Sequence, residues 1–98
     1  MLKKERNDVK KLLKAVLALK TEEECAAFFE DICTIQEIDA LAQRLEVACL
    51  LCEGQSYIDI NKQTGASTAT ICRVSKCLNY GSGGYRKAID KLNISEEK

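Results

Sequence analysis

Histidine, proline and tryptophan are all absent from this 98-residue chain, and no long apolar run is present. Without histidine, the commonest general base is missing. No nucleophile paired with a base is found either, so an enzyme is the least favoured class. A membrane span would need about eighteen or more consecutive apolar residues, and no secretory signal pattern occurs. The sequence therefore predicts a soluble, cytoplasmic protein without catalytic activity.

Cysteine is frequent, with six residues in the chain. An intracellular protein keeps its thiols reduced, so a disulfide framework is not expected. Four of them are expected to be small buried hydrophobic residues on the apolar faces of helices: Cys25, Cys33, Cys49 and Cys52. Cys49 and Cys52 have metal-like spacing, but no second pair or histidine could complete a zinc site. We expect neither a metal nor a cofactor.

Charge is balanced overall but unevenly distributed along the chain. Residues 1–20 carry seven basic and two acidic groups, whereas residues 21–55 carry one basic and nine acidic groups. Residues 56–91 carry six basic and two acidic groups, for a local charge of +4. Such segregation can orient a protein on a polyanion even when the total charge is zero. For residues 1–20, an ordinary solvated helix face is an equally open interpretation.

Apolar periodicity and capping motifs predict an all-α chain of about six helices. Thr21 and Thr34 each begin a capping box, and Ser56 is expected to cap a later helix. The expected helices are Asn7–Lys20, a second one that starts at Thr21 and includes Ile32, a third from Thr34 to about Glu53, Tyr57–Gln63, Thr68–Cys77 and Tyr85–Leu92. Residues 93–98 are expected to be frayed.

The third predicted helix changes character along its length. In its first half one face is apolar and is expected to point inward: Ile38, Leu41, Ala42 and Leu45. Residues 47–52 are then apolar in every direction, which requires that the helix be surrounded. A chain this short has few other elements to cover it. We therefore expect an obligate homodimer whose N-terminal helices pack against the partner.

Residues 57–76 have the length and pattern of a helix-turn-helix, within a motif that spans about 56–78. Gly65 lies where the turn requires a left-handed backbone, which glycine adopts without steric cost. Ile60, Ile71 and Val74 are expected to be buried between the two helices. The second helix then presents small, hydroxyl and basic side chains to solvent, as expected of a helix that enters the DNA major groove.

With these features in place, the chain resembles the Trp repressor superfamily over roughly residues 34–78. The resemblance rests on Gly65-Ala66, on Ala69-Thr-Ile-Cys-Arg73 and, in the third helix, on Thr34 with Glu37, Ala40-Leu41 and Arg44. The loop at 79–85 is most similar to that of the short Trp-repressor-like branch without an established ligand. The resemblance implies an all-helical, intertwined homodimer, with residues 1–98 forming one DNA-binding domain per subunit.

In that family the turn and the second helix of the motif contact double-stranded DNA. Carried over by the resemblance, the contact positions are Ser67, Thr68, Ala69, Thr70, Cys72 and Arg73. Ser56, Lys62 and Lys76 are added as phosphate contacts because of their chemistry and placement. The threonines could meet base edges or thymine methyls, and Arg73 could reach guanine or phosphate. The leading hypothesis is a sequence-specific transcriptional regulator, a repressor, that binds a two-fold operator.

The resemblance also assigns an effector pocket to Thr34, Arg44 and Arg73. The residue after the second arginine is glycine in the Trp repressor, where the indole of tryptophan lies close to the backbone. Here it is Val74, and a branched side chain in a close-packed pocket costs about 1–3 kcal/mol or forces a shift. The sequence therefore argues against L-tryptophan as corepressor and leaves the effector unknown. Phosphate contacts or ion pairs with the acidic segment are the alternatives for the two arginines.

A second hypothesis is a small interaction or sensor module in which the two helices only form a structural corner. Its sharpest version is a thiol sensor that uses Cys72 and Cys77. Asn61 also departs from the usual pattern, because a small alanine is common at this position. It indicates that the turn packs differently from better-known examples.

Overall fold

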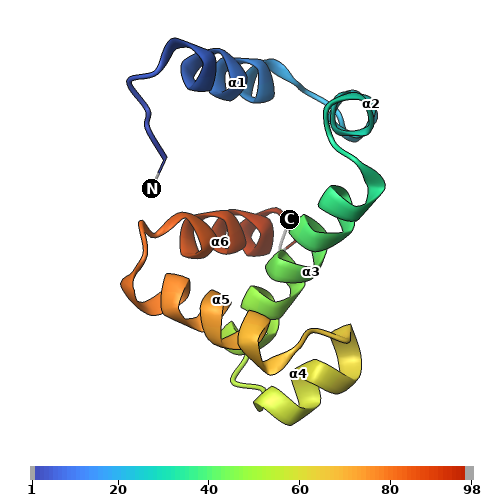
Figure 1. Ribbon diagram of the computed structural model, residues 1–98, viewed down its shortest axis with the longest axis vertical. Helices are drawn as coiled ribbons and strands as arrows, with labels where there is room; N and C mark the ends of the chain where they lie inside the picture. The colour runs from blue at the N-terminus through green and yellow to red at the C-terminus, as the bar shows by residue number, and fades with distance from the viewer. Residues whose placement is uncertain (1, 97–98) are drawn as a thin grey trace. The chain divides into compact units, whose positions relative to one another are not determined.

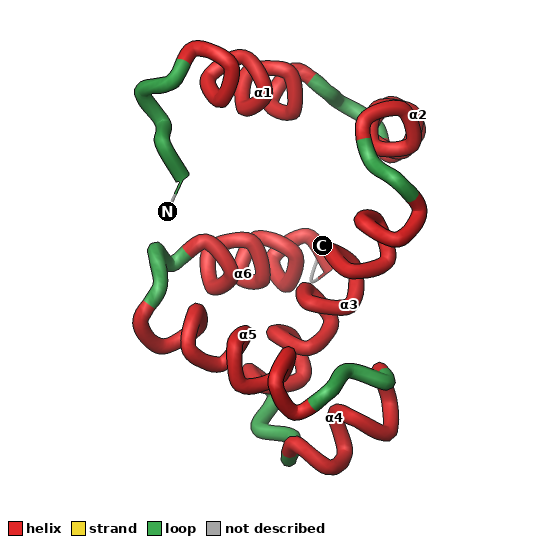
Figure 2. The backbone as a smooth tube through the Cα atoms, in the orientation of Figure 1, coloured by secondary structure: helices red, strands yellow, loops and turns green. Residues whose placement is uncertain are grey.

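The computed structural model describes residues 2–96, with the backbone alone for 94–96, and these residues form helices and connecting loops without a strand. Figure 1 shows the order of the helices and Figure 2 their separation by short loops. The helices are α1 (Asn7–Ala18), α2 (Glu22–Ile32), α3 (Ile35–Cys52), α4 (Tyr57–Thr64), α5 (Thr68–Tyr80) and α6 (Gly84–Glu96). The predicted all-α class is confirmed for this part of the chain. None of these helices is both long and apolar enough to span a membrane.

The chain divides into two compact units, Met1–Ile38 and Asp39–Lys98. In the first unit, the Thr21 hydroxyl oxygen accepts a hydrogen bond from the Glu24 amide at 3.1 Å, which caps α2 as predicted. Thr34 and Glu37 form a reciprocal capping box at the start of α3, with distances of 2.8 and 3.1 Å. In the first unit, α2 and α3 therefore begin with side-chain caps, whereas α1 begins without one and neither α1 nor α2 contributes a fully buried residue.

The second unit contains the apolar core, which α3, α4, the following turn, α5 and α6 build together. Its buried members are Val47, Ala48, Leu50, Ile60, Ala66, Ile71, Val74, Leu78 and Ile89. Half-buried Cys49, Leu51 and Tyr85 pack against them. The chain itself thus buries three residues of the apolar segment 47–52, for which a partner chain was expected to be needed.

Within this chain, the apolar face in the first half of α3, which was predicted to point inward, is largely uncovered. Leu41 is 47% exposed, Leu45 is 36% exposed and Ala42 is also exposed, whereas Ile38 is half-buried. Cys52 is exposed rather than buried, and Cys25, Cys33 and Cys49 are half-buried. The core residues of α3 come only from Val47, Ala48 and Leu50, so the apolar face that precedes them has little covering it.

Three helices also end two or more residues away from the predicted positions. Helix α1 ends at Ala18, where the extended backbone of Leu19 terminates it. Helix α5 continues to Tyr80, one residue before Gly81. Helix α6 runs to Glu96, so residues 93–96 are helical rather than frayed, while residues 97–98 lie outside the described part of the chain.

Candidate nucleic-acid interface

Helices α4 and α5 and the turn 65–67 form the predicted helix-turn-helix, and each of its ends has a defined cap. The Ser56 hydroxyl oxygen accepts from the Asp59 amide at 3.2 Å, which starts α4. Gly65 ends α4 with a left-handed backbone, φ +75°, and its N–H donates to the Asn61 carbonyl oxygen at 2.8 Å. The Ser67 hydroxyl oxygen then accepts from the Thr70 amide at 3.2 Å and starts α5. The local sequence thus determines where both helices begin and where α4 ends.

The inner side of the motif is buried, as the sequence predicts. Ile60 and Ile71 are 0% exposed and Val74 is 1% exposed. Ile71, Val74 and Leu78 recur at i, i+3 and i+7, so they form one stripe of α5 that lies in the core. Burial of this stripe fixes which face of α5 points to solvent.

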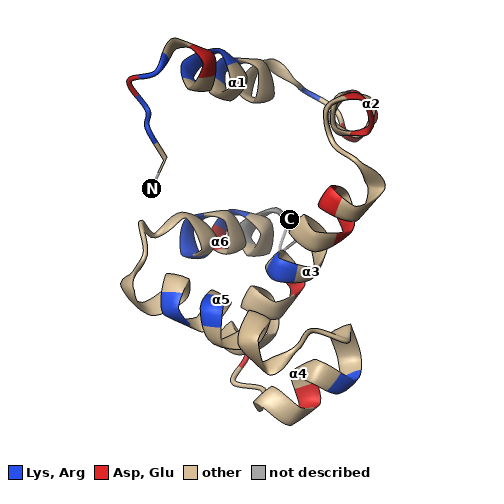
Figure 3. Cartoon of the chain, in the orientation of Figure 1, with Lys and Arg blue, Asp and Glu red and all other residues tan. Residues whose placement is uncertain are grey.

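The outer side of α5 carries the predicted DNA-contacting residues. Ala69, Cys72, Arg73 and Lys76 recur at i, i+3, i+4 and i+7, and all four are exposed. Ser67 and Thr68 are exposed at the start of the helix, whereas Thr70 is half-buried and its hydroxyl oxygen accepts from the Ser67 hydroxyl at 3.2 Å. Figure 3 shows basic but no acidic residues on α5. The exposed face of α5 is therefore formally positive.

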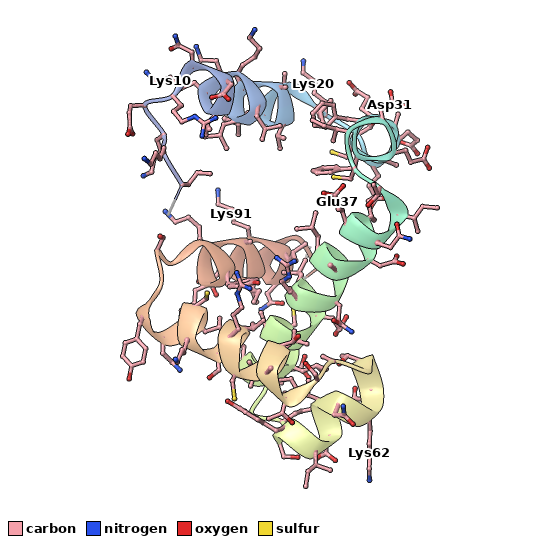
Figure 4. All side chains as sticks on the ribbon, viewed as in Figure 1. Lys10, Lys20, Asp31, Glu37, Lys62 and Lys91 are labelled. Carbon is pink, nitrogen blue, oxygen red and sulfur yellow. The ribbon has the colours of Figure 1, made fainter. Side chains whose placement is uncertain are left out.

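The basic side chains of this motif are available to an anion. Lys62, Arg73 and Lys76 are exposed and take part in no hydrogen bond or ion pair within residues 2–96. Lys62 projects outward from the last turn of α4 (Figure 4). Binding of a phosphate would therefore break no existing ion pair of these side chains in the described part of the chain. It would require only that their charged groups lose part of their hydration.

The three expected effector-pocket residues are divided between the two units. The Thr34 hydroxyl, in the first unit, is already engaged as the helix cap described above. Arg44 and Arg73, in the second unit, are exposed and form no ion pair with described residues, so the acidic segment does not neutralise them there. Val74 fills core space with its methyl groups.

The second unit also has a groove of about 510 Å³ between α3 and α6. It is lined by Ala42, Leu45, Glu46, Cys49, Cys52, Glu53, Ile89, Leu92 and Asn93. Arg44 and Arg73 do not line this groove. It is thus distinct from the effector site that the resemblance implies.

Three side chains that hold the motif in place were not predicted as such. The Gln43 amide nitrogen donates to the Thr64 carbonyl oxygen at 3.2 Å, and the Asn61 amide nitrogen donates to the Ala66 carbonyl oxygen at 2.8 Å. The Arg86 Nε donates to the Leu78 carbonyl oxygen at 3.0 Å. Gln43 and Arg86 act across long sequence separations, for which no local pattern exists. Asn61 was recognisable as an unusual residue, but its acceptor was not.

Comparison with known proteins is consistent with this geometry. Residues 7–93 match the family model described as Trp repressor protein. YerC of Bacillus subtilis (strain 168) is 53% identical over 89 residues, which cover 91% of this chain and 86% of that protein. The crystal structure of a TrpR-like protein from Eubacterium eligens ATCC 27750 superposes with a TM-score of 0.89 at 49% identity, covering 92% of this chain and 93% of the other. The chain therefore belongs to the Trp repressor family of DNA-binding regulators.

Proposed function

We propose that this protein is a sequence-specific transcriptional repressor that binds a two-fold operator as a homodimer. The observation that carries the proposal is the division of α5 into two faces. Its inner stripe is fully or almost fully buried. Its outer stripe is exposed and carries Arg73 and Lys76, which have no hydrogen bond or ion pair in the described part of the chain. A helix held in this way can place short side chains in the major groove while its cations meet phosphates.

Exposed apolar side chains in each unit support the homodimer. In the first unit they are Leu12, Leu13, Val16, Leu17, Ile32 and Ile35, and in the second unit they are Leu41 and Leu45 of α3. Leu17 and Ile35 are 83% and 75% exposed. Large apolar side chains left exposed on helix faces mark an interaction site, and a second copy related by a two-fold axis buries the same residues on both chains. Two reading helices then face one palindromic site.

Repression follows most simply from this arrangement. A dimer that occupies an operator with both α5 helices blocks access to the DNA beneath it, and no further activating surface is required. L-tryptophan is not part of the proposal, because Val74 is a buried core residue rather than a glycine beside an open site.

The proposed interface is tested by changing its two unpartnered cations. We expect the double variant Arg73→Ala/Lys76→Ala to bind duplex DNA at least about tenfold more weakly, because each subunit loses two charge contacts. The slope of log affinity against log salt concentration should decrease in magnitude by about two to four. Each phosphate contact contributes about 0.9 to this slope, and the dimer loses up to four contacts. The matched control is Lys87→Ala/Lys91→Ala, which removes the same charge from α6. Equal affinity and salt slope in the Arg73/Lys76 variant and the wild type would show that α5 is not the reading helix.

A further inference from the structure

The turn between α4 and α5 is held by side chains as well as by its own backbone. Gln43 of α3 donates to the Thr64 carbonyl oxygen at 3.2 Å, and Asn61 of α4 donates to the Ala66 carbonyl oxygen at 2.8 Å. The Ala66 N–H donates to the Thr64 hydroxyl oxygen at 3.1 Å. Because a carbonyl oxygen only accepts hydrogen bonds, each amide must present its nitrogen to the turn. Two carboxamides from two different helices thus hold a turn of three residues.

These contacts join α5 to the rest of the second unit at the end where its reading face begins. The Thr64 hydroxyl donates to the Ile60 carbonyl oxygen at 2.7 Å, and Ala66 is 1% exposed. The turn is therefore also held by a bond to α4 and by burial of Ala66 in the core. Gln43 lies 21 residues from Thr64 in the chain and connects the turn to α3. The residues that directly precede α5 are therefore linked to both α3 and α4.

A small change in the direction of α5 would matter for base reading. Arg73, which could reach a base edge, lies five residues beyond Thr68, or about 7.5 Å along the helix. A tilt of about 5° at the turn would then move the Arg73 backbone by about 0.7 Å, which exceeds the roughly 0.5 Å that a functional constellation tolerates. Contacts to phosphates by flexible lysine and arginine side chains tolerate such a shift better than contacts to base edges do.

We propose that Asn61 and Gln43 are positioning residues for sequence-specific DNA recognition, acting through the carbonyl groups of Thr64 and Ala66. This proposal rests on the DNA-reading function proposed above. Asn61 occupies a position where a small alanine is common in helix-turn-helix motifs, and an alanine could not form this bond. The chain thus carries its own means of fixing the angle of α5.

The test compares the preferred duplex, obtained by selection with the wild-type protein, with a scrambled duplex of equal length at the same salt concentration. We expect Asn61→Ala and Gln43→Ala each to lower affinity for the preferred duplex by about three- to tenfold, which corresponds to about 0.7–1.4 kcal/mol. Affinity for the scrambled duplex should change by less than about twofold and the salt slope should stay the same, since the phosphate contacts remain. Hydrogen exchange of the amides of residues 66–70 should become faster in both variants.

The matched control is Gln63→Ala, which removes an α4 amide that bonds to the half-buried Gln55 side chain instead of to the turn. A variant with an unchanged preference for the selected duplex would overturn the positioning role. An equal loss on both duplexes with a shallower salt slope would overturn it too, because Asn61 would then be a phosphate contact. The melting temperature of each variant distinguishes a general loss of fold from a specific loss of positioning. If Asn61→Ala does not fold, Gln43→Ala still tests the positioning role. If the wild type selects no duplex at all, the function proposed above fails, and the exchange rates then decide the structural part of this inference alone.

Discussion

The Arg86 guanidinium lies against the end of the reading helix, with its Nε 3.0 Å from the Leu78 carbonyl oxygen. That carbonyl belongs to the last turn of α5, where no further helical amide is available to bond it. A cation at a helix C-terminus also interacts favourably with the helix dipole. Helix α6 therefore stabilises α5 at one end, while the turn stabilises it at the other.

Arg86→Ala should lower the free energy of unfolding by about 1 kcal/mol, because a charged hydrogen bond and the dipole interaction are both lost. Urea denaturation measures this directly. The neighbouring Lys87→Ala serves as control, since its side chain is exposed and forms no hydrogen bond or ion pair with residues 2–96. Equal stability of the two variants would mean that the Arg86 contact contributes nothing to α5.

The most exposed aliphatic side chains of the first unit and of the start of α3 test the homodimer. Leu17→Glu/Ile35→Glu should cost little in a monomer, because these side chains are 83% and 75% exposed. In the proposed dimer they are buried, so two glutamates per chain should shift sedimentation towards monomer at micromolar concentration. Ile58→Glu on α4, where Ile58 is 69% exposed, should leave the oligomeric state unchanged. A double variant that sediments like the wild type would place the interface elsewhere.

The exposed thiol on the outer stripe of α5 gives an independent test of that face. Alkylation of Cys72 should weaken DNA binding at least about tenfold, because the added bulk displaces contacts worth about 1–3 kcal/mol. Cys72→Ser should therefore bind DNA and resist the reagent, whereas Cys77→Ser should remain sensitive. Gel-shift titrations before and after treatment measure the effect. If only Cys77→Ser keeps its DNA binding after alkylation, the result would instead favour the thiol-sensing alternative. The reactive thiol would then be Cys77, further along α5.

The sequence predicted the local parts of the fold well because they depend on neighbouring residues. The caps at Thr21, Thr34 and Ser56 and the left-handed Gly65 each involve partners within four positions. The exposure of Leu45 and Cys52 within this chain could not be predicted, because periodicity identifies an apolar face but not what covers it.

The candidate site shows the same division. The exposed stripe of α5 follows from helical periodicity once Ile71 and Val74 are buried. The contacts of Gln43 and Arg86 could not be predicted, because an amide or a guanidinium bonded to a distant carbonyl has no sequence signature. Those contacts link α5 and the turn before it to α6 and α3, in addition to the buried stripe of α5.

The central claim is that two α5 helices of a homodimer read one two-fold DNA site, and selection of bound duplexes from a random pool tests it most directly. The account predicts an enriched palindrome whose half-sites are centred about one helical turn apart, roughly 34–36 Å. The same sequence should emerge with and without free tryptophan, because Val74 takes the place of the glycine in the Trp repressor. A pool without enrichment, or a single half-site without its symmetry mate, would contradict the account.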